Sequence, residues 1–288
     1  MIYIFMALYQ EAESLIRHYH LKKDVQNTRF QVFFNEEAGI RLGITGVGSI
    51  AAAAAVSSVC TEYHAGCGDF LLNIGTGAAV AQSGDVGEVF LCNKLVEAVT
   101  GRTFYPDVLY GHDFFEGCLV TGAKPLDGAA GSMEEFAKDT VIYDMEAAAV
   151  YQAGAYFFGP HQMSFLKVIT DCGAARSVTA EQLKAKMTAA TGAIAAYIDS
   201  ILRTLAEEKA DGRADAKKQM EDVVRHLCVD LHCSKTMEAA LRQQIRYCVL
   251  SGSDYTAVIQ GMYAAGKLPC KDKREGKMRF EELKSRLL

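Results

Sequence analysis

The sequence predicts an α/β fold with a central mixed sheet flanked by helices and a small all-helical C-terminal appendage. Apolar runs of strand length alternate with helical patterns through residues 1–206, which is typical of a layered α/β domain. Residues 207–214 are polar and include a glycine, and beyond them apolar residues recur at helical spacing without a further strand pattern. We therefore expect two domains, residues 1–206 and residues 214–288.

Short apolar runs are predicted to form the strands of the sheet. They are residues 2–7, 30–34, 40–45, 70–74, 86–92, 118–121 and 163–169. The first run lacks a basic leader and is shorter than the core of a signal peptide, so a buried strand is the better interpretation.

Helical patterns separate these runs and then fill the C-terminal part. The expected helices are residues 11–20, 49–60, 144–155 and 179–206, then 215–230, 234–251, 253–265 and 278–287. The helix at 49–60 is rich in alanine, which indicates a closely packed neighbour that leaves room only for small side chains.

Composition excludes several classes of protein. Half of the residues are hydrophobic, yet no apolar run approaches the roughly 18 residues that a membrane span needs. Nine cysteines are scattered through a chain without an export signal, so we expect reduced thiols and a cytoplasmic location, with no membrane partner.

The net charge of −5 is distributed unevenly along the chain. Residues 1–206 carry 14 basic and 22 acidic side chains, whereas residues 207–288 carry 16 basic and 13 acidic ones. We favour a solvated helical tail over a nucleic-acid or acidic-partner surface, because no aromatic residues that could stack on bases are interleaved with the basic ones. A protein partner for the C-terminal helices is the alternative that stays open.

Three carboxylates stand where apolar elements begin or end. Glu11 closely follows the first strand, Glu146 begins an apolar run beside Met145, and Asp171 ends the strand that starts near residue 163. Carboxylates at such positions often lie at a sheet edge or in a cleft, where loss of solvent tunes their pKa. We expect these three to share one catalytic site.

Two glycine-rich segments follow predicted strands. Gly46-Val47-Gly48 precedes the helix at 49–60, where backbone N–H groups could approach a ligand oxygen, and Asn-Ile-Gly-Thr-Gly at 73–77 is expected to form a strand-end turn. For both segments the alternative is a turn that needs glycine only for its geometry.

Several short motifs together resemble the superfamily of purine nucleoside phosphorylases and methylthioadenosine/S-adenosylhomocysteine nucleosidases. They are Ile-Phe-Met-Ala at 4–7 with Glu11, Thr-Gly-Val-Gly at 45–48, Asn-Ile-Gly-Thr-Gly at 73–77, Asp-Met-Glu-Ala-Ala-Ala at 144–149 and Val-Ile-Thr-Asp at 168–171. All stand in the family's order and at about its spacing. The resemblance covers about residues 1–205 and implies a nucleoside-phosphorylase-like sheet, a nucleoside ligand, no cofactor or metal, and a homodimer or larger homo-oligomer.

The resemblance also implies a role for individual residues. Glu11 would activate water, Asp171 would share a proton with N7 of the leaving purine, and Glu146 would accept both ribose hydroxyls above Met145. The 5′ side would be lined by Phe104 and Tyr105, donated by a neighbouring subunit. The full set of implied binding residues is Ala7, Gly48, Thr76, Gly77, Asp144, Met145, Glu146, Thr170, Phe104 and Tyr105.

Departures from the phosphorylase pattern favour water over phosphate as the nucleophile. Asn73 stands where phosphorylases carry a phosphate-binding arginine, and the early glycine-rich turn with a second arginine is absent. The expected reaction is therefore hydrolysis of a purine nucleoside, with a 5′-thio-substituted adenosine as the candidate substrate. The alternatives are a phosphate-dependent phosphorylase and a nucleoside-binding regulatory protein with little catalysis.

Two further departures concern the base pocket. No aromatic residue occupies positions 124–126, where nucleosidases stack a phenylalanine on the base, and Lys167 stands where they usually carry arginine.

One cluster in the C-terminal part contains metal-binding residue types. His226, Cys228, His232 and Cys233 lie within eight residues, but their spacing matches no standard zinc finger, so a packed helical core is the favoured interpretation.

Overall fold

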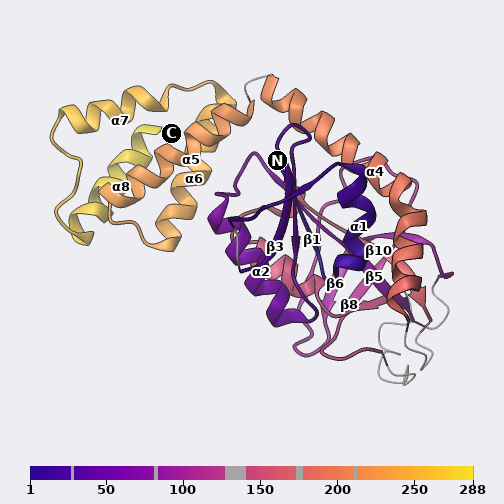
Figure 1. Ribbon diagram of the computed structural model, residues 1–288. Helices are drawn as coiled ribbons and strands as arrows, with labels where there is room; N and C mark the ends of the chain where they lie inside the picture. The colour runs from indigo at the N-terminus through magenta and orange to yellow at the C-terminus, as the bar shows by residue number, and fades with distance from the viewer. Residues whose placement is uncertain (27–28, 81–83, 127–140, 173–177, 211–212, 288) are drawn as a thin grey trace. The chain divides into compact units, whose positions relative to one another are not determined.

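The computed structural model describes residues 1–26, 29–80, 84–126, 141–172, 178–210 and 213–287 (Figure 1). The chain divides into two compact units, Met1–Glu207 and Glu208–Leu288. No helix in the described ranges is both long enough and apolar enough to cross a membrane.

The first unit is built on a mixed ten-stranded sheet. Its strands are hydrogen-bonded in the order β10-β6-β8-β9-β5-β1-β4-β3-β2, with β7 beside β6 and a further pairing of β10 with β5. The strands are β1 (Ile2–Met6), β2 (Lys22–Lys23), β3 (Gln31–Asn35), β4 (Ile40–Ile44), β5 (Phe70–Ala79), β6 (Val89–Glu97), β7 (Thr103–Phe104), β8 (Phe115–Thr121), β9 (Val141–Asp144) and β10 (Met163–Asp171).

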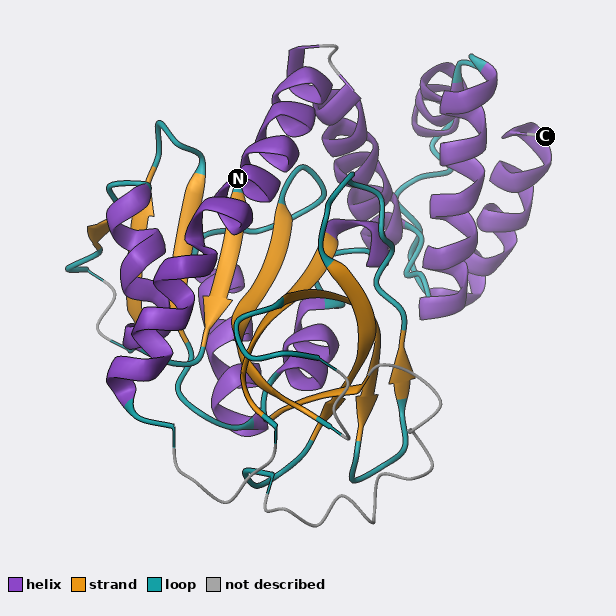
Figure 2. Ribbon diagram, turned by 90° about the vertical axis from the view of Figure 1, so that its right-hand side faces the viewer, coloured by secondary structure: helices purple, strands orange, loops and turns teal. Residues whose placement is uncertain are grey.

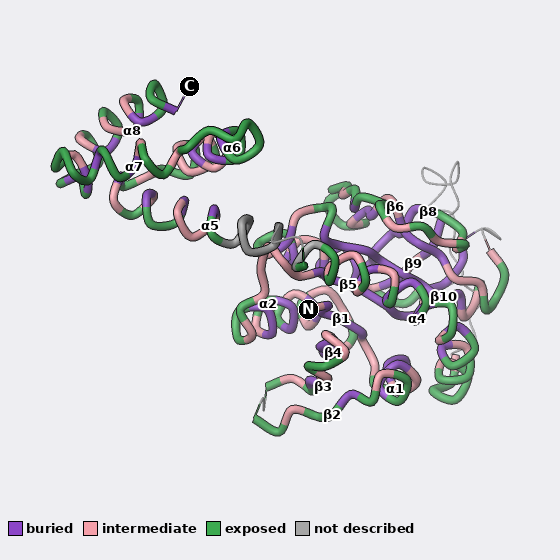
Figure 3. Tube along the Cα trace, turned by 90° about the horizontal axis from the view of Figure 1, so that it is seen from above, coloured by how far each residue is buried: buried purple, intermediate pink, exposed green. Residues whose placement is uncertain are grey.

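Part of this sheet closes into a ring. Because β10 pairs with both β5 and β6, and β9 pairs with both β5 and β8, five strands curve back on themselves (Figure 2). The strand β5 belongs to both parts of the sheet: its first half pairs with β1 and its last residues pair with β9. The strands of the ring are largely buried (Figure 3).

The expected turn at residues 73–77 is wrong, because β5 continues through both glycines to Ala79. Instead, the two glycines allow other parts of the chain to come close to β5. A Cβ on Gly77 would lie 2.8 Å from the side chain of Ile142 on β9, and a Cβ on Gly75 would lie 3.5 Å from a carboxylate oxygen of Glu11. Glycine therefore lets a neighbouring strand and an acidic side chain reach this part of β5.

Helices cover both faces of the sheet and bury one apolar cluster on each. On one face α1 (Tyr9–His18) and α4 (Ala180–Ala210) pack against the even-numbered residues of β1 and β5. On the other face α2 (Ser49–Glu62) and α3 (Ala147–Gly154) pack together, and their alanines allow the close contact that the sequence indicated. The predicted class, a central mixed sheet flanked by helices with a helical C-terminal part, is confirmed.

Other element boundaries differ from the expectations. The short strands β2, β7 and β9 were not predicted, and the helix expected from residue 144 begins at Ala147, because Asp144 still belongs to β9. The helix α4 continues to Ala210, so residues 207–210 of the expected linker are helical.

Beyond the end of α4, the described residues of the second unit form four helices, as the sequence predicted. They are α5 (Arg213–Asp230), α6 (Lys235–Ser251), α7 (Tyr255–Ala264) and α8 (Lys273–Leu287). Ser234 and Asp254 cap the N-termini of α6 and α7 with their side chains, and Gly252 ends α6 in the left-handed conformation at φ 70°. These helices enclose an apolar core of their own.

Replacement of Gly276 by Ala is expected to destabilise this helical unit. A Cβ on Gly276 would lie 1.9 Å from the carbonyl oxygen of Leu231, so α8 must move away from the end of α5. Such overpacking costs about 1–3 kcal/mol. Hydrogen exchange of the amides in α5–α8 measures the effect in the full chain.

The matched control is Gly261→Ala in α7. A Cβ on Gly261 meets no atom within 4 Å, and alanine favours a helix by about 1 kcal/mol over glycine. Equal protection from exchange in the two variants would show that the close approach of Gly276 to Leu231 does not matter for stability.

Candidate active site

Glu11 is held at the C-terminal end of β1, in the first turn of α1. Its side chain is 3% exposed. One carboxylate oxygen accepts hydrogen bonds from the backbone N–H of Thr76 at 2.9 Å and from its hydroxyl at 2.6 Å, and the other accepts from the backbone N–H of Leu8 at 3.1 Å. These donors fix the orientation of the carboxylate beside β5.

Glu146 occupies the N-cap position of α3 and is buried. Its Oε1 accepts a hydrogen bond from the backbone N–H of Gly48 at 2.8 Å. Gly48 has φ 97° and itself stands at the N-cap of α2, so a glycine is needed there for the backbone conformation. Ser49 donates from its hydroxyl to the carbonyl of Met145 at 3.2 Å. The turn before α2 and the turn before α3 are thus joined.

Asp144 and Lys167 form a buried ion pair close to these two carboxylates. Lys167 Nζ lies 2.8 Å from Asp144 Oδ2, and the side chains are 2% and 1% exposed. Asp144 also accepts from the hydroxyl of Thr121 at 2.6 Å and from the backbone N–H of Ala147 at 2.9 Å. Both oxygens of Asp144 are therefore engaged within the protein, and its carboxylate anchors the start of α3.

The charges interact strongly because the groups are buried. Burial raises the pKa of Glu146, Lys167 opposes this rise, and Asp144 and Glu11 add to it. Burial alone would lower the pKa of Lys167, but the carboxylates of Asp144, Glu146 and Glu11 outweigh burial and raise that pKa. The three carboxylates therefore favour the charged form of Lys167.

Asp171 ends β10 at the same edge of the sheet. The strands β1, β4, β5 and β10 run parallel, so their C-terminal ends meet. Asp171 is half-buried and pairs in register with Ala78, after an irregularity that follows Ile169. Thr170 donates from its hydroxyl to Asp171 at 3.2 Å and to the carbonyl of Gly77 at 3.4 Å.

The remaining expected site residues have the following places. Ala7 follows β1, and its carbonyl accepts from the backbone N–H of Gly46 at 3.1 Å. Met145 is half-buried between Asp144 and Glu146. Phe104 stacks on Tyr151 of α3 with ring centroids 4.9 Å apart, whereas Tyr105 is 61% exposed.

Sequence reasoning missed two supporting residues. Thr121 donates to Asp144 and also accepts from the backbone N–H of Ala148 at 3.0 Å, so it ties β8 to α3. Lys167 was noted only as a departure from arginine, although a lysine inside an apolar strand is itself a signal, because such a charge needs a buried partner.

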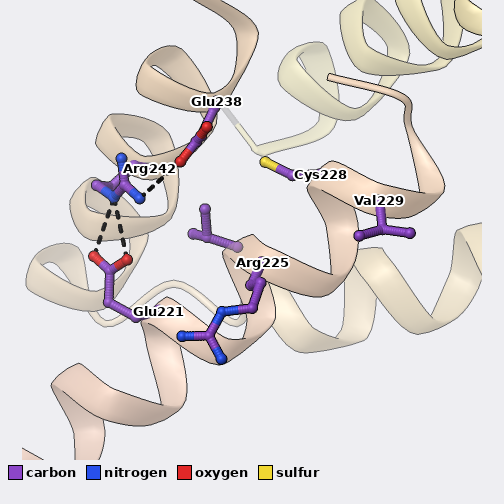
Figure 4. Close-up of a pocket in the computed structure, with 7 residues that line it drawn as sticks. Glu221, Arg225, Cys228, Val229, Glu238 and Arg242 are labelled. Carbon is purple, nitrogen blue, oxygen red and sulfur yellow. Dashed lines mark hydrogen bonds and ion pairs between the residues drawn. The ribbon is translucent and has the colours of Figure 1, made fainter. Parts of the chain in front are cut away.

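The C-terminal unit contains a pocket between α5 and α6 (Figure 4). Its principal cation is already paired: Arg242 Nε donates to both oxygens of Glu221 at 3.1 and 3.2 Å, and Nη2 donates to Glu238 at 3.1 Å (Figure 4). Nothing in this pocket resembles the carboxylate site of the first unit.

The cluster of histidines and cysteines is bonded to the backbone. His226 and His232 contact carbonyl oxygens of Asp222 and Cys270 at 2.8 and 3.0 Å, and Cys228 and Cys233 pack against the helical core. In the described part of the chain no three His, Cys, Asp or Glu side chains are placed to hold a metal ion.

The fold and this site can now be compared with known proteins. No protein-family profile matches the chain, and neither does any curated protein sequence. Solved structures do match. A methylthioadenosine/S-adenosylhomocysteine nucleosidase from Streptococcus pneumoniae, solved with a transition-state inhibitor, is 18% identical with a TM-score of 0.60, and the match covers 69% of this chain and 99% of that one.

Two further structures agree. The nucleosidase of the same type from Neisseria meningitidis is 20% identical with a TM-score of 0.54, over 65% of this chain and 96% of that one. A futalosine hydrolase mutant from Helicobacter pylori is 12% identical with a TM-score of 0.56, over 69% of this chain and 98% of that one.

The first unit therefore has the fold of these nucleosidases and of the futalosine hydrolase, which is the fold that the motifs led us to expect. The similar structures named here are nucleosidases and a hydrolase. At these identities the likeness establishes the fold, and the reaction has to be argued from the site.

Proposed function

We propose that this protein hydrolyses the N-glycosidic bond of a purine nucleoside. The observation that carries the proposal is the charge of the site. Glu11, Glu146 and Asp171 are brought to one edge of the sheet, and among the described residues Lys167 is the one cation beside the buried carboxylates, where it is paired with Asp144.

This charge distribution suits water as the nucleophile better than phosphate. Orthophosphate needs a dense set of cationic or N–H donors. Asn73 lies in the interior, 2% exposed, with its amide nitrogen bonded to the carbonyl of Phe5 at 3.0 Å. A neutral, buried amide cannot replace the arginine of a phosphate site, whereas water needs a base and Glu11 is available as one.

In the proposed reaction, water attacks C1′ and passes a proton to Glu11 while the bond between C1′ and N9 breaks. The bonding electrons go to N9, and Asp171 donates a proton to N7 so that the base leaves as a neutral molecule. Glu146 accepts hydrogen bonds from both ribose hydroxyls, as an ionised carboxylate can. Met145, Thr76, Gly77 and Thr170 line the pocket in this proposal.

The leading candidate substrate is a 5′-thio-substituted adenosine. The similar solved structures that act on such nucleosides support this choice. A panel of purine nucleosides with and without a 5′-thio group, assayed for free base in phosphate-free buffer, tests the proposal. We expect release of base from the 5′-thio compounds, and no release from any member of the panel would exclude a nucleosidase.

We also propose a homo-oligomer in the cytoplasm. Exposed apolar residues near the turn before α2 and near β7 suit contact with a second copy: Val47, Ile50 and Tyr105 are 52%, 89% and 61% exposed. Solution mass measured by light scattering tests the oligomer.

A further inference from the structure

Lys167 is a buried charge that the proposed reaction does not use directly. It lies in β10 between Gly75 of β5 and Phe90 of β6, and its side chain is 2% exposed. A buried cation that has no solvent to stabilise it persists only if fixed partners surround it. The partners of Lys167 therefore indicate what role its charge has in the site.

The ion pair with Asp144 holds the ammonium group in one place. Asp144 is itself held by hydrogen bonds from Thr121 and from the backbone N–H of Ala147. The ion pair therefore keeps Lys167 Nζ at one position. An ammonium group has three N–H donors, and Asp144 takes one of them at 2.8 Å. The other two donors are not taken by this contact.

The two carboxylates of the proposed reaction lie near Lys167. The position that a Cβ on Gly75 would occupy is 3.5 Å from Lys167 Nζ and 3.5 Å from Glu11 Oε1. Glu146 is close enough for its charge to act on Lys167 and on Glu11. The ammonium group of Lys167 and the carboxylate of Glu11, which would activate water, therefore both border the space that a side chain at position 75 would fill. Because Gly75 leaves this space empty of its own atoms, the two charges can interact across it.

We propose that Lys167 is a positioning residue that keeps Glu146 ionised and holds the carboxylates of Glu11 and Glu146 in place without touching the nucleoside. This inference rests on the proposed function for the roles of those two carboxylates. The titratable and charged groups that face Lys167 are Asp144 from β9, Glu146 from the start of α3, Glu11 from α1 and Cys92 from β6. Without the cation, carboxylates of like charge crowd together in a buried space, which favours their protonation.

The test compares the pH dependence of kcat/KM among variants. Lys167→Met should move the acidic limb to higher pH by about one unit or more, with activity at neutral pH reduced and partly recovered in more alkaline buffer. Lys167→Arg keeps the charge and should keep the limb of the wild type. Lys184→Met, which removes a surface lysine paired with Glu13, should leave the limb unmoved.

A second variant covers the risk that Lys167→Met alone fails to fold, because it leaves Asp144 buried without its cation. The double variant Asp144→Asn/Lys167→Met removes both charges together, which proteins commonly tolerate. The limb should still move to higher pH, by less than in the single variant, because the repulsion from Asp144 is also lost.

A readout without substrate separates this inference from the proposed function. The carboxyl ¹³C signal of Glu146 in Glu-labelled protein, assigned with Glu146→Gln, reports the titration of this group directly. We expect Glu146 to titrate at higher pH in the double variant than in the wild type. An unmoved titration would overturn the role of Lys167 even if the wild type cleaves nucleosides, whereas a shifted titration in a protein that releases no base would overturn only the reaction.

Discussion

Exchange of Asp171 for Asn, or of Glu11 for Gln, is expected to lower turnover by about 10²-fold or more, because a positioned acid or base commonly contributes 10²–10⁴-fold. Both variants keep the size of the side chain and remove its ability to transfer a proton. Glu11→Gln also keeps an oxygen that can accept from Thr76, so folding should be retained. Steady-state base release measures the effect.

The two variants can be told apart with a second substrate. A riboside whose leaving group departs as a nitrophenolate needs no proton from an acid, so Asp171→Asn should cleave it at nearly the rate of the wild type. Glu11→Gln should remain slow with both substrates, because activation of water is still required. Glu13→Gln is the matched control on α1, since Glu13 is ion-paired with Lys184. Full turnover of a nucleoside by Asp171→Asn would contradict the assigned acid.

Exchange of Glu146 for Gln is expected to weaken nucleoside binding by about 10- to 100-fold. Hydrogen bonds to a charged group contribute about 1.5–3 kcal/mol, and the neutral amide can accept with only one of its two terminal atoms. A nucleoside analogue with a carbon–carbon glycosidic bond, which cannot be cleaved, allows Kd to be measured by calorimetry. The control is Glu37→Gln in the exposed turn between β3 and β4.

The same residue sets the pH dependence of binding. Burial raises the pKa of Glu146 above the 4.5 of an ordinary glutamate. Because the ribose diol needs the ionised form, affinity should fall as the pH is lowered through this raised pKa, at a pH where an exposed glutamate would still be charged. In Glu146→Gln this fall should disappear. An unchanged pH dependence in that variant would assign the effect to another group.

Much of the fold could be predicted from the sequence, and so could the three carboxylates of the candidate site. Alternating apolar runs indicated the layered sheet, and carboxylates at the ends of apolar elements indicated Glu11, Glu146 and Asp171. Each of these signals is local, because a strand end or a helix start can be recognised within a few residues.

The parts that could not be predicted depend on contacts between distant segments. The glycines at 75 and 77 indicated a turn, yet the strand β5 continues through them. Their role is to leave room for Glu11 and for β9, which come from distant parts of the sequence. The ion pair of Asp144 with Lys167 joins β9 to β10, and neither residue alone shows which partner it has. The role of Thr121 could not be predicted for the same reason. Its hydroxyl links β8 to the start of α3, and these two segments are distant in the sequence.

The central claim, hydrolysis rather than phosphorolysis, is tested most directly by identifying the sugar product with phosphate as the only variable. One reaction is run after enzymatic removal of phosphate and a second with phosphate in excess. The absence of a described cation other than Lys167 beside the buried carboxylates predicts equal rates and the free sugar in both. A rate that needs phosphate, with the sugar 1-phosphate as product, would contradict it.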